Sequence, residues 1–234
     1  MSRERFERDA TTHAALFYPG TDVLMNLPGI RNAARLESAE RRLVTIRMRQ
    51  AAPPDARRLD YPGFLALHRH LFQDVYLWAG QERAYLTARG PTPFARPEHI
   101  RAWMEGRFAR LREERYLADL APRRFAERAA EHVNEINACH PFVEGNGRTL
   151  RAWLAQLADQ AGFRIELSSR DDRAWHDASR KGFVEMDHEP MAQLIAARLS
   201  VDPTREEARR AAFLKSRAQD ADKSIGDRAL NNLM

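Results

Sequence analysis

The sequence contains very little cysteine: Cys139 is the only one among 234 residues. A single cysteine excludes an intramolecular disulfide and a zinc site built from clustered cysteines. No apolar run approaches the roughly 20 residues that a membrane-spanning helix needs. The first residues are charged and have no apolar stretch of the kind that a secretory signal carries. We therefore expect a cytoplasmic protein with no membrane partner.

A large excess of one charge is missing as well. The sequence has 38 Lys and Arg residues and 33 Asp and Glu residues, which gives a formal net charge of +5. A basic balance can attract nucleic acid. Here, however, the arginines are interspersed with acidic residues and form no dense basic run, which favours an ordinary solvated surface. We expect no direct nucleic-acid partner, and a length sufficient for one sizeable core.

Hydrophobic residues recur three and four positions apart over most of the chain, which is the pattern of amphipathic helices. This pattern predicts helices near residues 35–49, 64–75, 100–111, 122–136, 146–161, 171–185 and 190–199. Pro122 suits the first turn of a helix, and Gly162 suits the end of the helix before it. The fold class we expect is all-α in the main.

Residues 80–97 depart from this pattern, because several prolines and glycines there cannot sit inside a helix. Alternation from Arg83 to Thr87 predicts a short strand, and the turn at residues 89–92 predicts a hairpin. We expect this hairpin to be the only β structure. After Leu199 the sequence becomes polar and charged, so we expect one domain over residues 1–200 and a charged helix or tail over 201–234.

The run from His140 to Arg151 reads His-Pro-Phe-Val-Glu-Gly-Asn-Gly-Arg-Thr-Leu-Arg. His140 follows an apolar stripe and should therefore lie on the inside of the helical bundle, where Pro141 ends the helix. The apolar stripe consists of Phe125, Ala129, Val133 and Ile136. The carbonyl end of a helix favours a protonated imidazole, so His140 is a candidate proton acceptor.

Gly145 and Gly147 open the next predicted helix and let its backbone approach a ligand closely. The free N–H groups at such a helix start bind phosphates. Arg148 and Arg151 lie three residues apart, so we expect both to project from the same side and clamp a polyphosphate. Glu144, at the edge of this anion site, is a candidate ligand for Mg²⁺ bound to phosphate oxygens. Together these groups indicate nucleotidyl or phosphoryl transfer.

This run resembles the signature of the Fic family, His-x-Phe-x-(Asp/Glu)-Gly-Asn-Gly-Arg-x-x-Arg, and it fills every fixed position. Residues 71–80 are similar to the family's segment before its hairpin. Residues 18–27 resemble the N-terminal stretch of stand-alone bacterial Fic toxins. The resemblance covers residues 18–199 and implies the Fic fold, a helical bundle with one short β-hairpin that forms a flap.

The resemblance also implies an activity: a protein adenylyltransferase that moves AMP from ATP to a hydroxyl of a target protein. His140 would take the proton from that hydroxyl, and Glu144 would hold Mg²⁺ between the α- and β-phosphates. The remaining motif residues would bind ATP: Gly145, Asn146 and Gly147 would cradle the phosphates, Arg148 would lie at the α/β side and Arg151 at the γ-phosphate.

The hairpin from Thr87 to Phe94 would be the flap, which pairs with the target's backbone by strand addition. Phe94 would clamp the acceptor side chain. The related Doc branch, which phosphorylates its target, has Lys where this chain has Gly147, and this difference favours AMP transfer.

Many Fic proteins carry a self-inhibiting helix of pattern (Ser/Thr)-x-x-x-Glu-(Gly/Asn), and no Ser or Thr of this chain has Glu at the required place. Family likeness then implies a toxin whose inhibitory Glu comes from a separate small antitoxin and pairs with Arg151. The same likeness implies gyrase or topoisomerase IV as the target. Two alternatives stay open: a non-catalytic nucleotide- or nucleic-acid-binding module, and transfer of a different phosphate-linked group.

Two other features receive plain structural interpretations. Cys139 and His140 are adjacent on a helix and do not face each other, so we expect Cys139 to be a small buried residue rather than a nucleophile. His68 and His70 lie two apart and should point to opposite sides of their helix, so we expect no zinc pair.

Overall fold

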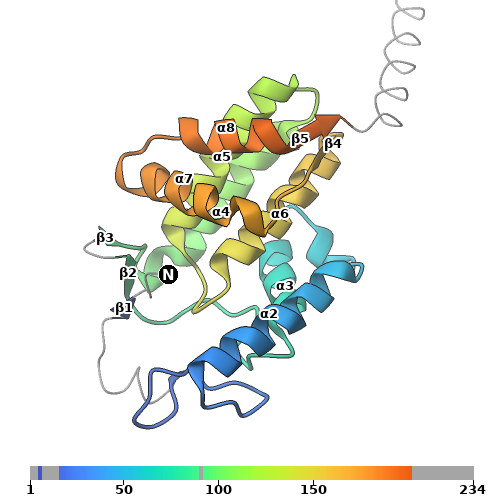
Figure 1. Cartoon of the computed structure of the whole chain (residues 1–234). Helices are drawn as coiled ribbons and strands as arrows, with labels where there is room; N and C mark the ends of the chain where they lie inside the picture. Colours follow the sequence, from blue (N-terminus) through green and yellow to red (C-terminus); the bar gives the residue numbers. More distant parts are fainter. Residues whose placement is uncertain (1–4, 7–15, 90–91, 202–234) are drawn as a thin grey trace, which may run out of the picture.

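The computed structural model describes residues 5–6, 16–89 and 92–201, and these are mainly helical, as predicted (Figure 1). The α-helices are α2 (Ala33–Arg49), α3 (Tyr61–Phe72), α4 (Pro97–Glu113), α5 (Pro122–Cys139), α6 (Asn146–Gln160), α7 (Asp172–Val184) and α8 (Glu189–Arg198). Short 3₁₀ turns connect them at Asp55–Arg57, Arg115–Leu117 and Ser169–Asp171. None of the described helices is long and apolar enough to cross a membrane.

The helix ends follow local sequence signals. Asp60 caps α3 by accepting a hydrogen bond from the Gly63 amide, so this helix begins at Tyr61 rather than at residue 64. It ends at Phe72 rather than at residue 75. Pro122 occupies the first turn of α5, and Gly162 adopts a left-handed φ of 87° just after α6, both as predicted.

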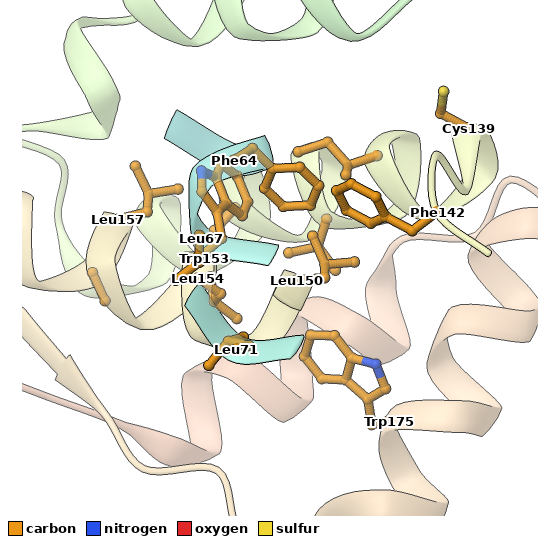
Figure 2. Close-up of a cluster of buried hydrophobic side chains, with 14 of the residues drawn as sticks. Phe64, Leu67, Leu71, Cys139, Phe142, Leu150, Trp153, Leu154, Leu157 and Trp175 are labelled. Carbon is orange, nitrogen blue, oxygen red and sulfur yellow. The ribbon is translucent and has the colours of Figure 1, made fainter. Parts of the chain in front are cut away.

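Helix α5 forms the centre of the bundle and packs against α4, α6, α7 and α8 (Figure 1). Its predicted apolar stripe is fully buried. Figure 2 shows the adjoining part of the core, where Phe64, Leu67 and Leu71 of α3 lie near α6 and Phe142. Trp153 of α6 is fully buried there, so truncating it to Ala would cost about 3 to 5 kcal/mol of stability. This core supports both ends of the loop between α5 and α6.

The predicted hairpin is confirmed, with strands β2 (Thr87–Arg89) and β3 (Thr92–Pro93) pairing antiparallel. Its turn at residues 90–91 lies outside the described residues. The strand begins at Thr87 rather than Arg83, because the Arg83 amide donates instead to the Pro141 carbonyl.

The prediction that this hairpin is the only β structure is wrong. Strand β1 (Arg5–Phe6) pairs with β2 to make a three-stranded sheet. A second sheet joins β4 (Phe163–Ile165) to β5 (Leu199–Val201), which brings the end of α8 beside the end of α6. Each strand has three residues or fewer, too few to show a period-two pattern. The domain boundary at residue 200 stays a prediction, because residues 202–234 lie outside the described part.

Candidate active site

His140 forms the corner between α5 and the motif loop. Its backbone is left-handed (φ 52°, ψ 61°), and its amide closes the last turn of α5 by donating to the Ile136 carbonyl. Proline disfavours a right-handed helical conformation in the residue before it, so Pro141 ends the helix here as predicted. A left-handed non-glycine residue costs about 1 kcal/mol, which the surrounding packing must offset. The side chain is 3% exposed, on the inside of the bundle as predicted.

Arg83 holds this corner in place. Its guanidinium donates to four backbone carbonyls: His140 at 2.7 Å, Tyr85 at 2.6 Å, Ala95 at 2.5 Å and Cys139 at 3.1 Å. Two of these carbonyls belong to the end of α5 and two to the base of the hairpin. A cation is favourable at the carbonyl end of a helix. Buried Arg83 therefore ties the hairpin to the histidine, a role that its place in an expected strand did not indicate.

The hairpin also reaches His140 directly. The ring of Phe94 stacks on the His140 imidazole, and the ring of Phe183 from α7 stacks on Phe94 with centroids 4.8 Å apart. The Phe94 amide donates to the Thr87 carbonyl and closes the base of the hairpin. The structure thus places Phe94 against the candidate base, while Thr87 is joined to Phe94 through the backbone.

The loop after His140 turns sharply at Gly145, which has a φ of 86°. A Cβ there would lie 2.3 Å from the Phe72 ring, so only glycine fits without movement. Asn146 accepts a hydrogen bond from the Phe142 amide and donates one to the Phe142 carbonyl. Its side chain therefore braces the loop, and only its backbone is left to contribute to the predicted anion site. Gly147 lies in the first turn of α6, where an added Cβ would meet nothing within 4 Å.

His68 supports the loop from beneath. Its Nε2–H donates to the Glu144 carbonyl at 2.9 Å, and its Nδ1 accepts from the Gly80 amide at 2.8 Å. Burial lowers the pKa of His68 to about 3, so the imidazole is neutral. Its ring also stacks on Phe142, with centroids 3.7 Å apart. Sequence reasoning treated His68 only as a poor zinc ligand and missed this role.

The two motif arginines diverge. Arg148 binds Glu40 of α2 at 2.5 Å and Glu144 at 3.2 Å. Arg151 binds Asp172 of α7 at 2.5 Å, and its guanidinium lies over the Trp175 ring. In this conformation the two arginines form three ion pairs with carboxylates of α2, α7 and the motif loop. The sequence did not indicate Glu40 or Asp172.

Glu144 lies at the mouth of this site, with a side chain 45% exposed. Its Oε1 accepts hydrogen bonds from the Gly145 amide and from Arg148. Mg²⁺ is usually held by one or two carboxylates plus substrate phosphates and water. A single reachable carboxylate beside a helix start fits that donor set. No cluster of three or more His, Cys, Asp or Glu side chains that could hold a metal ion occurs among the described residues.

Cys139 and His70 make structural contacts. Cys139 is buried, with its thiol directed at the Ile100 carbonyl of α4, and burial raises the pKa of this thiol to about 12. It is therefore no thiolate nucleophile at neutral pH. His70 contacts the Arg47 carbonyl, whereas the ring nitrogens of His68 contact the Glu144 carbonyl and the Gly80 amide.

The chain is similar to known proteins over the segment that contains this site. A family model described as the Fic/DOC family matches residues 58–158. "Probable protein adenylyltransferase y4lH" of Sinorhizobium fredii is 40% identical over 169 residues, covering 72% of this chain and 87% of the relative. "Probable protein adenylyltransferase Fic" of Escherichia coli is 36% identical over 166 residues, covering 70% and 82%.

Longer relatives and solved structures match as well. "Protein adenylyltransferase VbhT" of Bartonella schoenbuchensis is 31% identical over 92% of this chain, which spans 43% of that relative. The crystal structure of the BepC protein from Bartonella tribocorum with bound AMPPNP superposes with a TM-score of 0.72, covering 80% of this chain and 97% of that chain. At 22% identity this match establishes a shared fold.

Proposed function

Because the chain belongs to the Fic/DOC family, we propose that it is a protein adenylyltransferase, which transfers AMP from ATP to a hydroxyl side chain of a target protein. The observation that carries this proposal is the arrangement at the junction of α5 and α6. There, His140 lies at one end of a loop whose other end opens a helix N-terminus flanked by Arg148 and Arg151. The curated relatives named adenylyltransferases support the same reaction.

In the proposed reaction His140 accepts the proton of the target hydroxyl as its oxygen bonds to the α-phosphorus of ATP. The bond from that phosphorus to the β-bridging oxygen breaks, and pyrophosphate leaves. The backbone amides at the start of α6 and the two arginines stabilise the negative charge of the phosphates. Mg²⁺ held by Glu144 would supply further neutralisation of that charge when bound.

The finer parts of the proposal rest on family likeness. We propose that the hairpin around Thr87 and Phe94 docks the target, that the enzyme acts in the cytoplasm, and that it is the toxin of a toxin–antitoxin pair. Its target class would be the bacterial type II topoisomerases, gyrase and topoisomerase IV. The missing inhibitory pattern supports a separate antitoxin whose Glu pairs with Arg151. That Glu would have to displace Asp172, which holds Arg151 in this structure.

Labelling with two forms of ATP tests the transferred group. The protein is incubated in a bacterial lysate with α-³²P-ATP and, in parallel, with γ-³²P-ATP. Label on a protein band from the α form alone supports AMP transfer. Label from the γ form would identify a kinase instead, and no label from either would favour a non-catalytic nucleotide-binding module. Parallel reactions with labelled UTP test for transfer of another nucleotide.

A further inference from the structure

A buried carboxylate outside the motif contacts the proposed ATP site. Glu40 of α2 binds Arg148 Nη2 through Oε1 at 2.5 Å, and the Tyr76 hydroxyl donates to the other oxygen, Oε2. The Glu40 side chain is only 10% exposed. Glu40 also precedes residues 58–158, the segment that the family model matches. The contact therefore joins α2, the loop after α3 and the first turn of α6.

The surroundings keep this contact in one arrangement. A buried carboxylate is costly unless it is paired and hydrogen-bonded, and Glu40 is both. Burial and the nearby Glu40 charge raise the pKa of Tyr76, so its hydroxyl stays protonated and remains a donor. On its other side, Arg148 lies over the Phe72 ring, 4.8 Å from the centroid. The guanidinium is thus held between an aromatic face and a fixed carboxylate.

We propose that Glu40 and Tyr76 are positioning residues for ATP, which hold the Arg148 guanidinium where the phosphates bind. This inference rests on the proposed function. A guanidinium has five N–H donors, and the pairing with Glu40 and Glu144 occupies a single nitrogen, Nη2. The other donors stay available to phosphate oxygens. Orienting the group before ATP arrives reduces the entropy lost when the phosphates bind.

A competing role for Glu40 predicts the opposite effect on ATP binding. If the Glu40 carboxylate instead competes with phosphate for Arg148, removing it should tighten ATP binding. Calorimetry at constant salt would compare the wild type with Glu40→Ala, Glu40→Gln and Tyr76→Phe, using ATP·Mg²⁺ and adenosine as separate ligands. Glu37→Ala is the matched control, since Glu37 lies on the same helix and pairs with exposed Arg41.

Positioning predicts that Glu40→Ala weakens ATP binding about tenfold or more while adenosine affinity stays within about twofold. Glu40→Gln retains an acceptor for Arg148 and should recover most of the affinity. Tyr76→Phe should weaken ATP binding a few-fold, and Glu37→Ala should have no effect. In an Arg148→Ala background, Glu40→Ala should cause no further loss, because Glu40 acts through Arg148.

Several outcomes would overturn the inference. Equal or tighter ATP binding by Glu40→Ala would contradict positioning, and so would ATP binding by Glu40→Gln that is tighter than that of the wild type. Proportional loss of ATP and adenosine affinity would reveal a merely structural role. If Glu40→Ala does not fold, as judged by thermal unfolding, Tyr76→Phe decides, and an unchanged ratio of the two affinities would reject the idea. A wild-type protein that binds no ATP would instead refute the proposed function itself, and this inference with it.

Discussion

The rings of Phe94 and His140 lie face to face, with centroids 4.0 Å apart and planes inclined by 10°. Phe94 comes from the hairpin and His140 from the end of α5, so this contact joins the proposed docking element to the proposed base. Arg83 makes a second connection between the same two parts through backbone carbonyls. Movement of the hairpin should therefore alter the position of the imidazole.

Replacing Phe94 with Ala should slow AMP transfer about ten- to a hundredfold, because the imidazole loses the ring that fixes its orientation. ATP affinity should change little, since the loop at Gly145 is untouched. The measurement is the initial rate of target labelling beside calorimetric ATP affinity. Trp103→Ala is the control, as it removes a partly exposed aromatic from α4. A Phe94→Ala protein that labels the target at the wild-type rate would show that the stacking has no catalytic role.

The two glycines of the motif loop offer a matched pair. Gly145→Ala should destabilise the protein by about 1 to 3 kcal/mol, because its Cβ would collide with Phe72 and its φ is left-handed. Gly147→Ala adds the same methyl group to open space within a helix, so stability should be equal or slightly higher. Urea denaturation measures both. Equal losses in the two variants would contradict the steric account of Gly145.

Arg83→Met should destabilise the fold by about 3 kcal/mol or more, because it leaves several buried carbonyls without their donor. Arg83→Lys should recover only part of this loss, since an ammonium group cannot reproduce the planar fork of donors. Arg96→Met, at an exposed arginine paired with Glu98, is the control. Denaturation curves decide the matter, and similar small effects at both arginines would refute the role given to Arg83.

Because His68 is buried and neutral, we expect the protein to become less stable in acid. The pKa of His68 in the folded state, about 3, lies below the value of about 6.5 in an unfolded chain. Between these values the unfolded state binds a proton that the folded state does not. Stability should therefore fall as pH drops from about 6.5 toward 3, with a slope of at most about 1.4 kcal/mol per pH unit from this group.

The free energy of unfolding measured from pH 7 to 5 checks this. His68→Gln should reduce the slope of the unfolding free energy against pH by up to about 1.4 kcal/mol per pH unit, which corresponds to one proton. The control His99→Gln, which removes an exposed imidazole from α4, should not reduce it. Buried His132 also has a lowered pKa and contributes with the same sign in all three proteins. An unchanged slope in His68→Gln would contradict a neutral His68.

The parts predictable from sequence were those specified locally. The helical bundle follows from apolar spacing. The corner at His140 and the turn at Gly145 follow from Pro141 and from glycine itself, because these constraints act between adjacent residues. The hairpin could be located by its prolines and glycines, although its first strand begins later than the alternation suggested.

The missed features all depend on contacts between distant segments. Glu40 reaches Arg148, Asp172 reaches Arg151 and His68 reaches Glu144 only after the helices have packed. Spacing along one helix specifies its own faces and not the residues that a neighbouring helix presents to them. The expectation of one arginine clamp considered α6 alone, so it did not include the ion pairs that α2 and α7 make with Arg148 and Arg151.

The central claim is that His140 acts as the base at a site where ATP binds independently of it. The most direct test measures ATP affinity and single-turnover transfer of α-³²P label for the wild type and His140→Ala. We predict ATP affinity within about threefold of the wild type and transfer reduced about a hundredfold or more. Transfer by His140→Ala at a rate close to that of the wild type would contradict the account.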